Sequence, residues 1–206
     1  MIITHEYPYH IVARSNNKEW FYLPINDCWE IFSFLLIKIN LKFKFQIHSF
    51  ILMNNHYHLI GTASEHFPLP QVMEWFQRSA NRIINDKAKR VNHLFGGPYR
   101  ATLINGEAQF YQVTKYLYRN PISAKLTSKV EDYPYTTIVP TNIPLSSPST
   151  GIAAFLPKNY DQLLIYLNES YTCQEKEILD AAIKKSIFKV SSRISNELKD
   201  KLIFCM

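Results

Sequence analysis

Residues 45–61 read FQIHSFILMNNHYHLIG, and this stretch predicts a β-hairpin. Its first eight residues are mostly apolar, as in a buried strand. An Asn-Asn pair at 54–55 follows, and it tolerates the positive φ that a two-residue hairpin loop needs. Successive side chains of a strand point to opposite faces, so His56 and His58 project together while Tyr57 turns away. Two imidazoles on one rigid face make half of a divalent-metal site.

Hydrophobic spacing on either side of the hairpin predicts the rest of the fold. The expected elements are a strand over residues 7–13, a helix with Asp27 as its N-cap, a helix over 69–89, a short strand over 99–104 and a helix over 107–119. The order β-α-β-β-α-β-α predicts an α+β fold, with a ferredoxin-like or RRM-like antiparallel sheet and its helices packed on one face. The other face of such a sheet is left open for a ligand or for nucleic acid.

The last third of the chain has a different character. Residues 136–151 are rich in Thr, Pro and Ser, which predicts an extended linker. Three short helices are expected beyond it, at residues 161–170, 174–187 and 192–204. They are too few to bury a large core alone, so we expect this tail to dock on the main domain.

Composition narrows the class of protein. The chain has 206 residues, 47% of them apolar and only five of them glycine, which predicts a folded globular protein with one substantial core. The formal net charge is +6, and residues 78–100 hold six basic residues against one acidic residue. This clustering favours a polyanion such as nucleic acid, although a solvated helix face would give the same pattern.

Several features predict a cytoplasmic protein with no membrane partner. The three cysteines, Cys28, Cys173 and Cys205, are odd in number and have no metal-binding spacing, which fits a reducing compartment. Residues 1–10 lack the apolar stretch of a signal peptide. The longest apolar run, residues 31–37, is too short to span a bilayer.

Residues 115–121 read KYLYRNP and supply further candidate groups for the site. Tyr116 and Asn120 are four residues apart, so on one helix they share a face about 6 Å apart along the axis. If they address the same point as His56 and His58, the histidines and the Asn120 oxygen would hold a cation that polarises a scissile phosphate. Tyr116 would then be the nucleophile and form a phosphotyrosine. Asn120 precedes a proline, which disfavours helical geometry at that residue.

Three stretches taken together resemble a known family. They are residues 9–14 (YHIVAR), 52–60 (LMNNHYHLI) and 116–124 (YLYRNPISA), and DYPYTT at 132–137 closes the similar region. In this order they are similar to the bacterial REP-associated tyrosine transposases, single-tyrosine relatives of the HUH single-strand DNA transposases. The family usually has a proline where this chain has Asn55, and an aromatic-Ser-Ser ending where it has Tyr135-Thr136-Thr137.

The resemblance implies roles for individual residues. His56, His58 and Asn120 are the expected ligands of a divalent metal, Mg²⁺ or Mn²⁺, and Tyr116 is the expected catalytic nucleophile. The implied substrates are single-stranded DNA hairpins from palindromic repeats, cut to leave a 5′-phosphotyrosine and a free 3′-hydroxyl. The implied division of the chain is an HUH single-tyrosine transposase domain over 1–137, an extended linker over 138–151 and a C-terminal helical tail over 152–206.

We also expect DNA contacts from basic and aromatic residues around these motifs. Trp75, Arg78, Arg82 and Lys89 fall along one side of the second predicted helix, where stacking and phosphate contacts would grip a single strand. A solvated basic face with a half-buried tryptophan is the plainer alternative. The other candidates are Arg14, Arg100, Lys115 and Arg119.

The leading hypothesis is a metal-dependent single-stranded DNA endonuclease and strand transferase, a transposase that acts on hairpin DNA. One alternative is a catalytically silent nucleic-acid-binding regulator that retains the fold, and another is a metal-dependent RNA phosphodiesterase without a covalent step. The presence of both Tyr116 and Asn120 argues against the silent regulator. The connection over residues 99–107 is tight, so we expect a monomer in which Tyr116 serves the site of its own chain.

Overall fold

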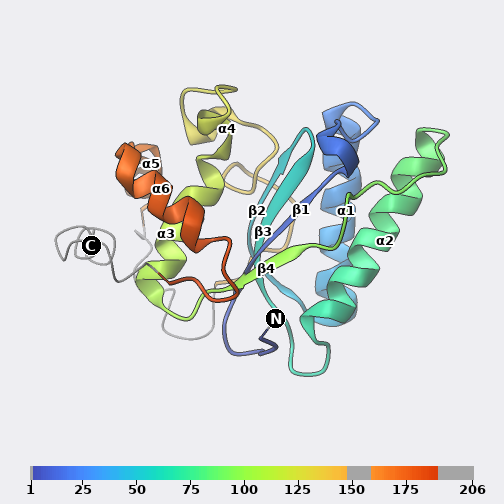
Figure 1. The fold of residues 1–206 in the computed structure, drawn as a ribbon, viewed down its shortest axis with the longest axis horizontal. Helices are drawn as coiled ribbons and strands as arrows, with labels where there is room; N and C mark the ends of the chain where they lie inside the picture. Colours follow the sequence, from blue (N-terminus) through green and yellow to red (C-terminus); the bar gives the residue numbers. More distant parts are fainter. Residues whose placement is uncertain (1, 148–158, 190–206) are drawn as a thin grey trace.

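A computed structural model describes residues 2–147 and 159–189 of the chain. Its centre is a four-stranded antiparallel sheet with the strand order β2-β3-β1-β4 (Figure 1). The strands are β1 (Tyr9–Arg14), β2 (Gln46–Met53), β3 (His56–Thr62) and β4 (Arg100–Leu103). Helix α1 (Ile25–Phe43) connects β1 to β2, and α2 (Leu69–Lys87) connects β3 to β4. This topology confirms the ferredoxin-like α+β fold expected from the sequence.

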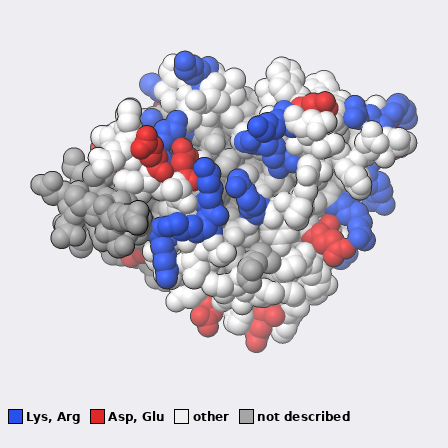
Figure 2. Space-filling view, viewed as in Figure 1, with Lys and Arg blue, Asp and Glu red and all other residues white. Residues whose placement is uncertain are grey.

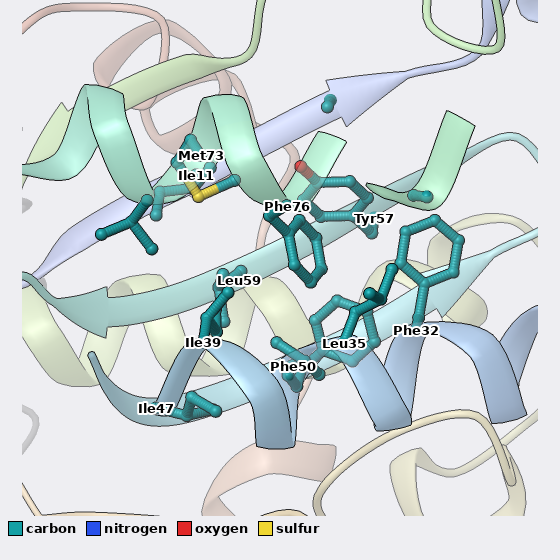
Figure 3. Close-up of a cluster of buried hydrophobic side chains, with 14 of the residues drawn as sticks. Ile11, Phe32, Leu35, Ile39, Ile47, Phe50, Tyr57, Leu59, Met73 and Phe76 are labelled. Carbon is teal, nitrogen blue, oxygen red and sulfur yellow. The ribbon is translucent and has the colours of Figure 1, made fainter. Parts of the chain in front are cut away.

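Helices α1 and α2 cover one face of the sheet (Figure 1). Strand alternation directs Ile11 and Leu59 toward the buried faces of the two helices, where they meet Phe32 of α1 and Phe76 of α2 (Figure 3). Apolar residues three and four apart line the buried side of each helix, as the sequence predicted. Helix α1 begins at Ile25 with its N-cap at Pro24, so the cap predicted at Asp27 is wrong. Asp27 lies in the first turn, where its charge suits the helix dipole.

Helix α3 (Glu107–Tyr118) packs on the opposite face together with the tail helices α5 (Tyr160–Asn168) and α6 (Cys173–Ala182). Figure 1 shows these three helices on one side of the sheet and α1 and α2 on the other. The expectation of an open second face therefore holds only in part. Strand β2 is buried on both faces, and Ile51 joins Val113 and Leu117 of α3 in a second buried cluster. The helix expected over 192–204 lies outside the described residues.

Chain segments beyond the core occupy both edges of the sheet. At one edge, Tyr135 and the first part of the expected linker, as far as residue 146, follow the outer side of β2, where the Leu52 N–H donates to the Tyr135 carbonyl at 2.9 Å. At the other edge Leu103 of β4 exchanges backbone hydrogen bonds with Ser186 and Phe188. Covering edge strands in this way protects unpaired backbone groups. Among the described residues, no helix is long and apolar enough to cross a bilayer.

The turn that precedes His56 is held by the loop after β1, which contains the 3-10 helix η1 (Asn16–Lys18). The N–H groups of Ser15 and Phe21 donate to the carbonyls of Asn55 and Asn54 at 2.8 and 2.9 Å. Neither Asn54 nor Asn55 has a positive φ, so that part of the sequence prediction is wrong. The two-residue turn itself is present, and tertiary hydrogen bonds stabilise it.

Candidate active site

Strand β3 carries the two histidines on the face of the sheet that α3 covers. The side chain between them, Tyr57, is fully buried in the opposite core, as strand alternation requires. The ring centroids of His56 and His58 lie 5.2 Å apart. On the adjacent strand β1, Nε2 of His10 lies 2.9 Å from Nδ1 of His58, and both side chains are buried. Three imidazoles therefore form one cluster.

All three rings are held in the neutral form. Burial, helped by the charge of Arg14, lowers the pKa of His56 to about 4. Burial and the charge of Arg100 lower the pKa of His10 to about 3. The pKa of His58 is also well below its usual value because of burial and the neighbouring histidines. Neutral imidazole keeps a free lone pair, which is the form that binds metals.

Helix α3 brings Tyr116 to this cluster. The centroid of the Tyr116 ring lies 6.1 Å from those of both His10 and His58, in edge-on geometry. Burial raises the pKa of the Tyr116 phenol, and the nearby carboxyl of Asp180 on α6 raises it further. The phenol therefore keeps its proton at neutral pH.

Asn120 begins the short helix α4 (Asn120–Ser123), two residues beyond the end of α3 at Tyr118. It is not part of the helix that carries Tyr116, in line with the constraint from the following proline. Its Nδ2 donates to the carbonyls of Tyr116 and Leu117 at 2.9 and 3.1 Å. The other polar atom of the amide, Oδ1, is left to offer a lone pair to a cation. The side chain is thus tied to the last turn of the tyrosine helix.

These groups fit a divalent cation. Two neutral imidazoles and an amide oxygen are a donor set that suits such ions. Residues 2–147 and 159–189 contain no group of three or more His, Cys, Asp or Glu side chains able to hold a metal. Oδ1 of Asn120 is the further donor atom that the sequence predicted beside His56 and His58.

A basic groove lies beside the cluster. Arg14 ends β1 and Arg100 begins β4, and both side chains are exposed. Together with Lys18 and the loop 96–98 they line a hollow of about 680 Å³. Positively charged side chains also gather across the middle of the face seen in Figure 2, between the side that carries α5 and α6 and the side that carries α2. The field of Arg14 and Arg100 reaches Tyr116 and lowers the pKa of its phenol, against the larger effect of burial.

Comparison with known proteins assigns the family. Residues 3–120, more than half of the chain, match the sequence profile described as "Transposase IS200 like". The chain belongs to the IS200-like transposase family. The matched span of this IS200-like transposase includes His56, His58, Tyr116 and Asn120. The expectation of a transposase, and thus of an enzyme, is confirmed.

One solved structure supports the fold of this IS200-like transposase. A REP-associated tyrosine transposase bound to a REP hairpin aligns with a TM-score of 0.55 and 14% identity, over 66% of this chain and 79% of that chain. A candidate transposase from Deinococcus radiodurans R1 aligns with a TM-score of 0.40 and 14% identity, over 56% of this chain and 89% of that chain. A search of curated proteins finds no match.

Lys115 and Arg119 of the transposase face its own tail. The ammonium of Lys115 lies 3.0 Å from the Glu169 carboxylate and 4.6 Å from the ring centroid of Tyr166. Arg119 donates to the carbonyls of Leu167 and Asn168. Both side chains are more than 90% buried, so the prediction that they contact DNA is corrected. They anchor α5 on α3.

The basic side of α2 lies on the far side of the sheet from Tyr116. Trp75 is half-buried against Phe43, and the centroids of the two rings lie 5.7 Å apart. Arg78 pairs with Glu74 at 2.6 Å, and both side chains are largely exposed to solvent. Further along, Arg82 lines a hollow with Trp75 and Arg78, and Lys89 follows the end of the helix with a φ of 55°. Arg78 also borders a hollow at the loop 96–98, which connects this side of α2 with the basic groove.

Sequence reasoning missed three residues that touch the cluster. Asn55 was interpreted only as a turn residue, and neither His10 nor Asp180 was among the predicted site residues. Strand pairing could have indicated His10, because its position on β1 depends only on the sheet order. Nothing in the sequence pointed to Asp180, which reaches Tyr116 only because α6 docks on α3.

Proposed function

We propose that this IS200-like transposase is a metal-dependent single-stranded DNA endonuclease and strand transferase that acts on hairpin DNA through a 5′-phosphotyrosine intermediate. The observation that carries the proposal is the position of Tyr116, whose ring centroid lies 6.1 Å from that of His58. A phenol, two neutral imidazoles and a basic groove meet at one place. This is the set of groups that phosphoryl transfer from a polyanion requires.

Each group has a role in the proposed reaction. His56, His58 and Oδ1 of Asn120 would hold a divalent cation, Mg²⁺ or Mn²⁺, which would supply Lewis-acid polarisation of the scissile phosphate. The phenolic oxygen of Tyr116 attacks phosphorus, and the bond from phosphorus to the 3′-oxygen breaks. The leaving oxygen takes a proton from water and becomes the 3′-hydroxyl. The phosphotyrosine conserves the bond energy until another 3′-hydroxyl reverses the step.

Asp180 is the proposed acceptor of the phenolic proton. Its carboxyl is close enough to the Tyr116 phenol to raise the pKa of that group. Because the pKa of the phenol is raised, the proton leaves only as the new oxygen–phosphorus bond forms and the phenol becomes more acidic. A tail helix would in this way contribute a group to the active site.

The proposed substrate enters along the basic groove. Arg14 and Arg100 contact phosphates next to the cleaved bond, and the path continues over the loop 96–98 to Arg78, Arg82, Trp75 and Lys89 on α2. The structurally similar tyrosine transposase was solved with a REP hairpin bound, which supports a hairpin as the form of DNA. We place the protein in the cytoplasm, where the free thiols of Cys28 and Cys173 stay reduced.

Removing divalent metal is expected to stop cleavage without stopping DNA binding. A labelled DNA hairpin with single-stranded flanks would be incubated with protein in Mn²⁺ and in excess chelator. We expect the cleavage rate in chelator to fall by at least about a hundredfold, because polarisation of the phosphate is lost. Gel-shift titration under both conditions measures binding separately. Full cleavage in chelator would contradict the metal assignment.

Replacing Arg14 and Arg100 with Ala is expected to weaken DNA binding and its dependence on salt. The slope of log affinity against log salt should fall by about 0.7 for each lost phosphate contact on a single strand. Lys38→Ala is the matched control, because it removes one exposed charge from α1 on the far side of the sheet. An Arg78→Ala, Arg82→Ala variant tests the path over α2 in the same titration. An unchanged slope in the first variant would remove the groove from the DNA path.

We propose that the protein works as a monomer with Tyr116 acting in cis, since Tyr116, His10 and His58 of a single chain already meet. A mixture of Tyr116→Phe and His56→Ala proteins is therefore expected to stay inactive at equimolar concentration. The hairpin cleavage assay measures this, with each variant alone as the baseline. Restored cleavage in the mixture would mean that two chains share their sites.

A further inference from the structure

The Nδ1 atoms of the two candidate ligand rings are both engaged by neighbouring side chains. His56 Nδ1 lies 2.6 Å from the side-chain oxygen of Asn55. His58 Nδ1 lies 2.9 Å from Nε2 of His10. An imidazole has two nitrogens, so Nε2 is the atom that each ring has left for a cation. A neutral ring can use it only when its proton sits on Nδ1.

Asn55 determines the position of the proton on His56. The Nδ2 of Asn55 donates to the carbonyl of Lys18 at 2.7 Å, and this fixes which way the amide faces. Its oxygen is therefore the atom turned to His56, and a carbonyl oxygen can only accept a hydrogen bond. The proton between Asn55 and His56 must belong to Nδ1 of the ring. His56 is thus left with a lone pair on Nε2.

His10 is in the same relation to His58. The two rings are nearly parallel, at 11° with centroids 5.1 Å apart, and their nitrogens share one hydrogen bond. His10 is 1% exposed, so the sheet and α3 hold it in place. When His58 donates from Nδ1, His10 accepts at Nε2 and carries its own proton on Nδ1. The Nδ1 atom of His10 is buried with no hydrogen-bond partner in the described structure.

We propose that His10 and Asn55 are positioning residues that hold His58 and His56 in the Nδ1-protonated tautomer, so that both rings offer Nε2 to the cation. The proposal rests on the proposed function, because the cation is the one assigned there to His56 and His58. A group that hydrogen-bonds to the ring nitrogen not used for the metal fixes the tautomer and orientation of a ligand imidazole. Asn55 then has a role beyond the turn.

We expect the affinity for metal to fall when His10 or Asn55 is replaced by a residue that cannot accept a hydrogen bond from His58 or His56. His10→Leu and Asn55→Leu remove the accepting atom, and each should raise the Mn²⁺ dissociation constant by about 10- to 100-fold. His10→Gln and Asn55→Asp are the matched variants, because each keeps an accepting oxygen for the ring at the same reach along the side chain. Asn55→Asp loses the hydrogen bond to the Lys18 carbonyl, as Asn55→Leu does, so the pair differs in the acceptor for His56. These two should bind Mn²⁺ close to the wild-type affinity.

The experiment has two readouts, neither of which is activity. Two-bond proton–nitrogen correlation spectra of the metal-free, ¹⁵N-labelled full chain report the tautomer of each histidine ring. Paramagnetic resonance of free Mn²⁺ gives the dissociation constant of the metal. Dispersion of the backbone amide spectrum confirms that each variant is folded before its affinity is compared.

We expect the Nδ1-protonated tautomer for His56 and His58 in the wild type, weaker Mn²⁺ binding in the two Leu variants and recovery in His10→Gln and Asn55→Asp. An Nε2-protonated His58 in the wild type would overturn the proposal, and so would wild-type Mn²⁺ affinity in the Leu variants. A wild-type chain that binds no Mn²⁺ would overturn the cation assignment of the proposed function, while the ring spectra would still decide the tautomers.

Discussion

Tyr116→Phe is expected to lower the rate of hairpin cleavage by about 10⁴-fold or more and to leave hairpin binding nearly unchanged. The substitution removes only the phenolic hydroxyl, which supplies the attacking oxygen. The ring contacts with His10 and His58 remain, since both are made by the aromatic ring at 6.1 Å between centroids. Single-turnover cleavage and gel-shift titration measure the two effects separately.

Tyr118→Phe is the matched control for that experiment. Tyr118 lies two residues further along α3, is 5% exposed and shares a hydrogen bond with Thr137 at 3.0 Å. Losing this bond should cost about 1 kcal/mol of stability and leave cleavage intact. Cleavage by Tyr116→Phe near the wild-type rate would rule out the covalent mechanism.

His58→Ala is expected to lower the cleavage rate by at least about a hundredfold, and excess Mn²⁺ should restore only part of it. The variant loses one of the three proposed protein ligands and with it part of the proposed polarisation of the phosphate. It also leaves His10 buried without its hydrogen-bond partner, so some loss of stability is expected as well. Cleavage rates across a Mn²⁺ titration, taken at a temperature where the variant is folded, measure the effect.

His48→Ala separates the loss of a ligand from the loss of a buried histidine. His48 lies on β2, and its two ring nitrogens bond to the Ser146 carbonyl and to Thr62 at 2.6 and 2.7 Å. It has a structural role, so His48→Ala should lower stability and keep the wild-type Mn²⁺ dependence. The same Mn²⁺ dependence in His58→Ala and His48→Ala would contradict the ligand assignment of His58.

The sequence predicted the parts of the fold that local periodicity determines. The alternation around Tyr57 located the hairpin and put His56 and His58 on one face, and the apolar spacing of Phe32 and Phe76 located α1 and α2. These signals are local because apolar residues recur along the sequence with the period of the strand or helix that they form. The sheet order followed from the order of the elements.

Local periodicity could not predict which residues of the main domain contact the C-terminal tail. Lys115 was expected on DNA, but its partner Glu169 lies 54 residues further along the chain. Asp180 reaches Tyr116 from a helix whose own pattern gives no sign of where it docks. Charge and spacing identify groups that can bind a phosphate, whereas burial against a distant segment decides which of them are free to do so.

Detection of a covalent DNA adduct on Tyr116 is the most direct test of the proposed cleavage mechanism. Wild-type protein would be incubated with a DNA hairpin and Mn²⁺, quenched in denaturant, digested with trypsin and nuclease, and analysed by mass spectrometry. Trypsin releases residues 116–119, which contain both Tyr116 and Tyr118, so fragment ions must assign the modified ring. The proposed mechanism predicts a nucleotide joined through its 5′-phosphate to Tyr116. Cleaved DNA with a free 5′-phosphate and no adduct on that peptide, or an adduct on Tyr118, would contradict it.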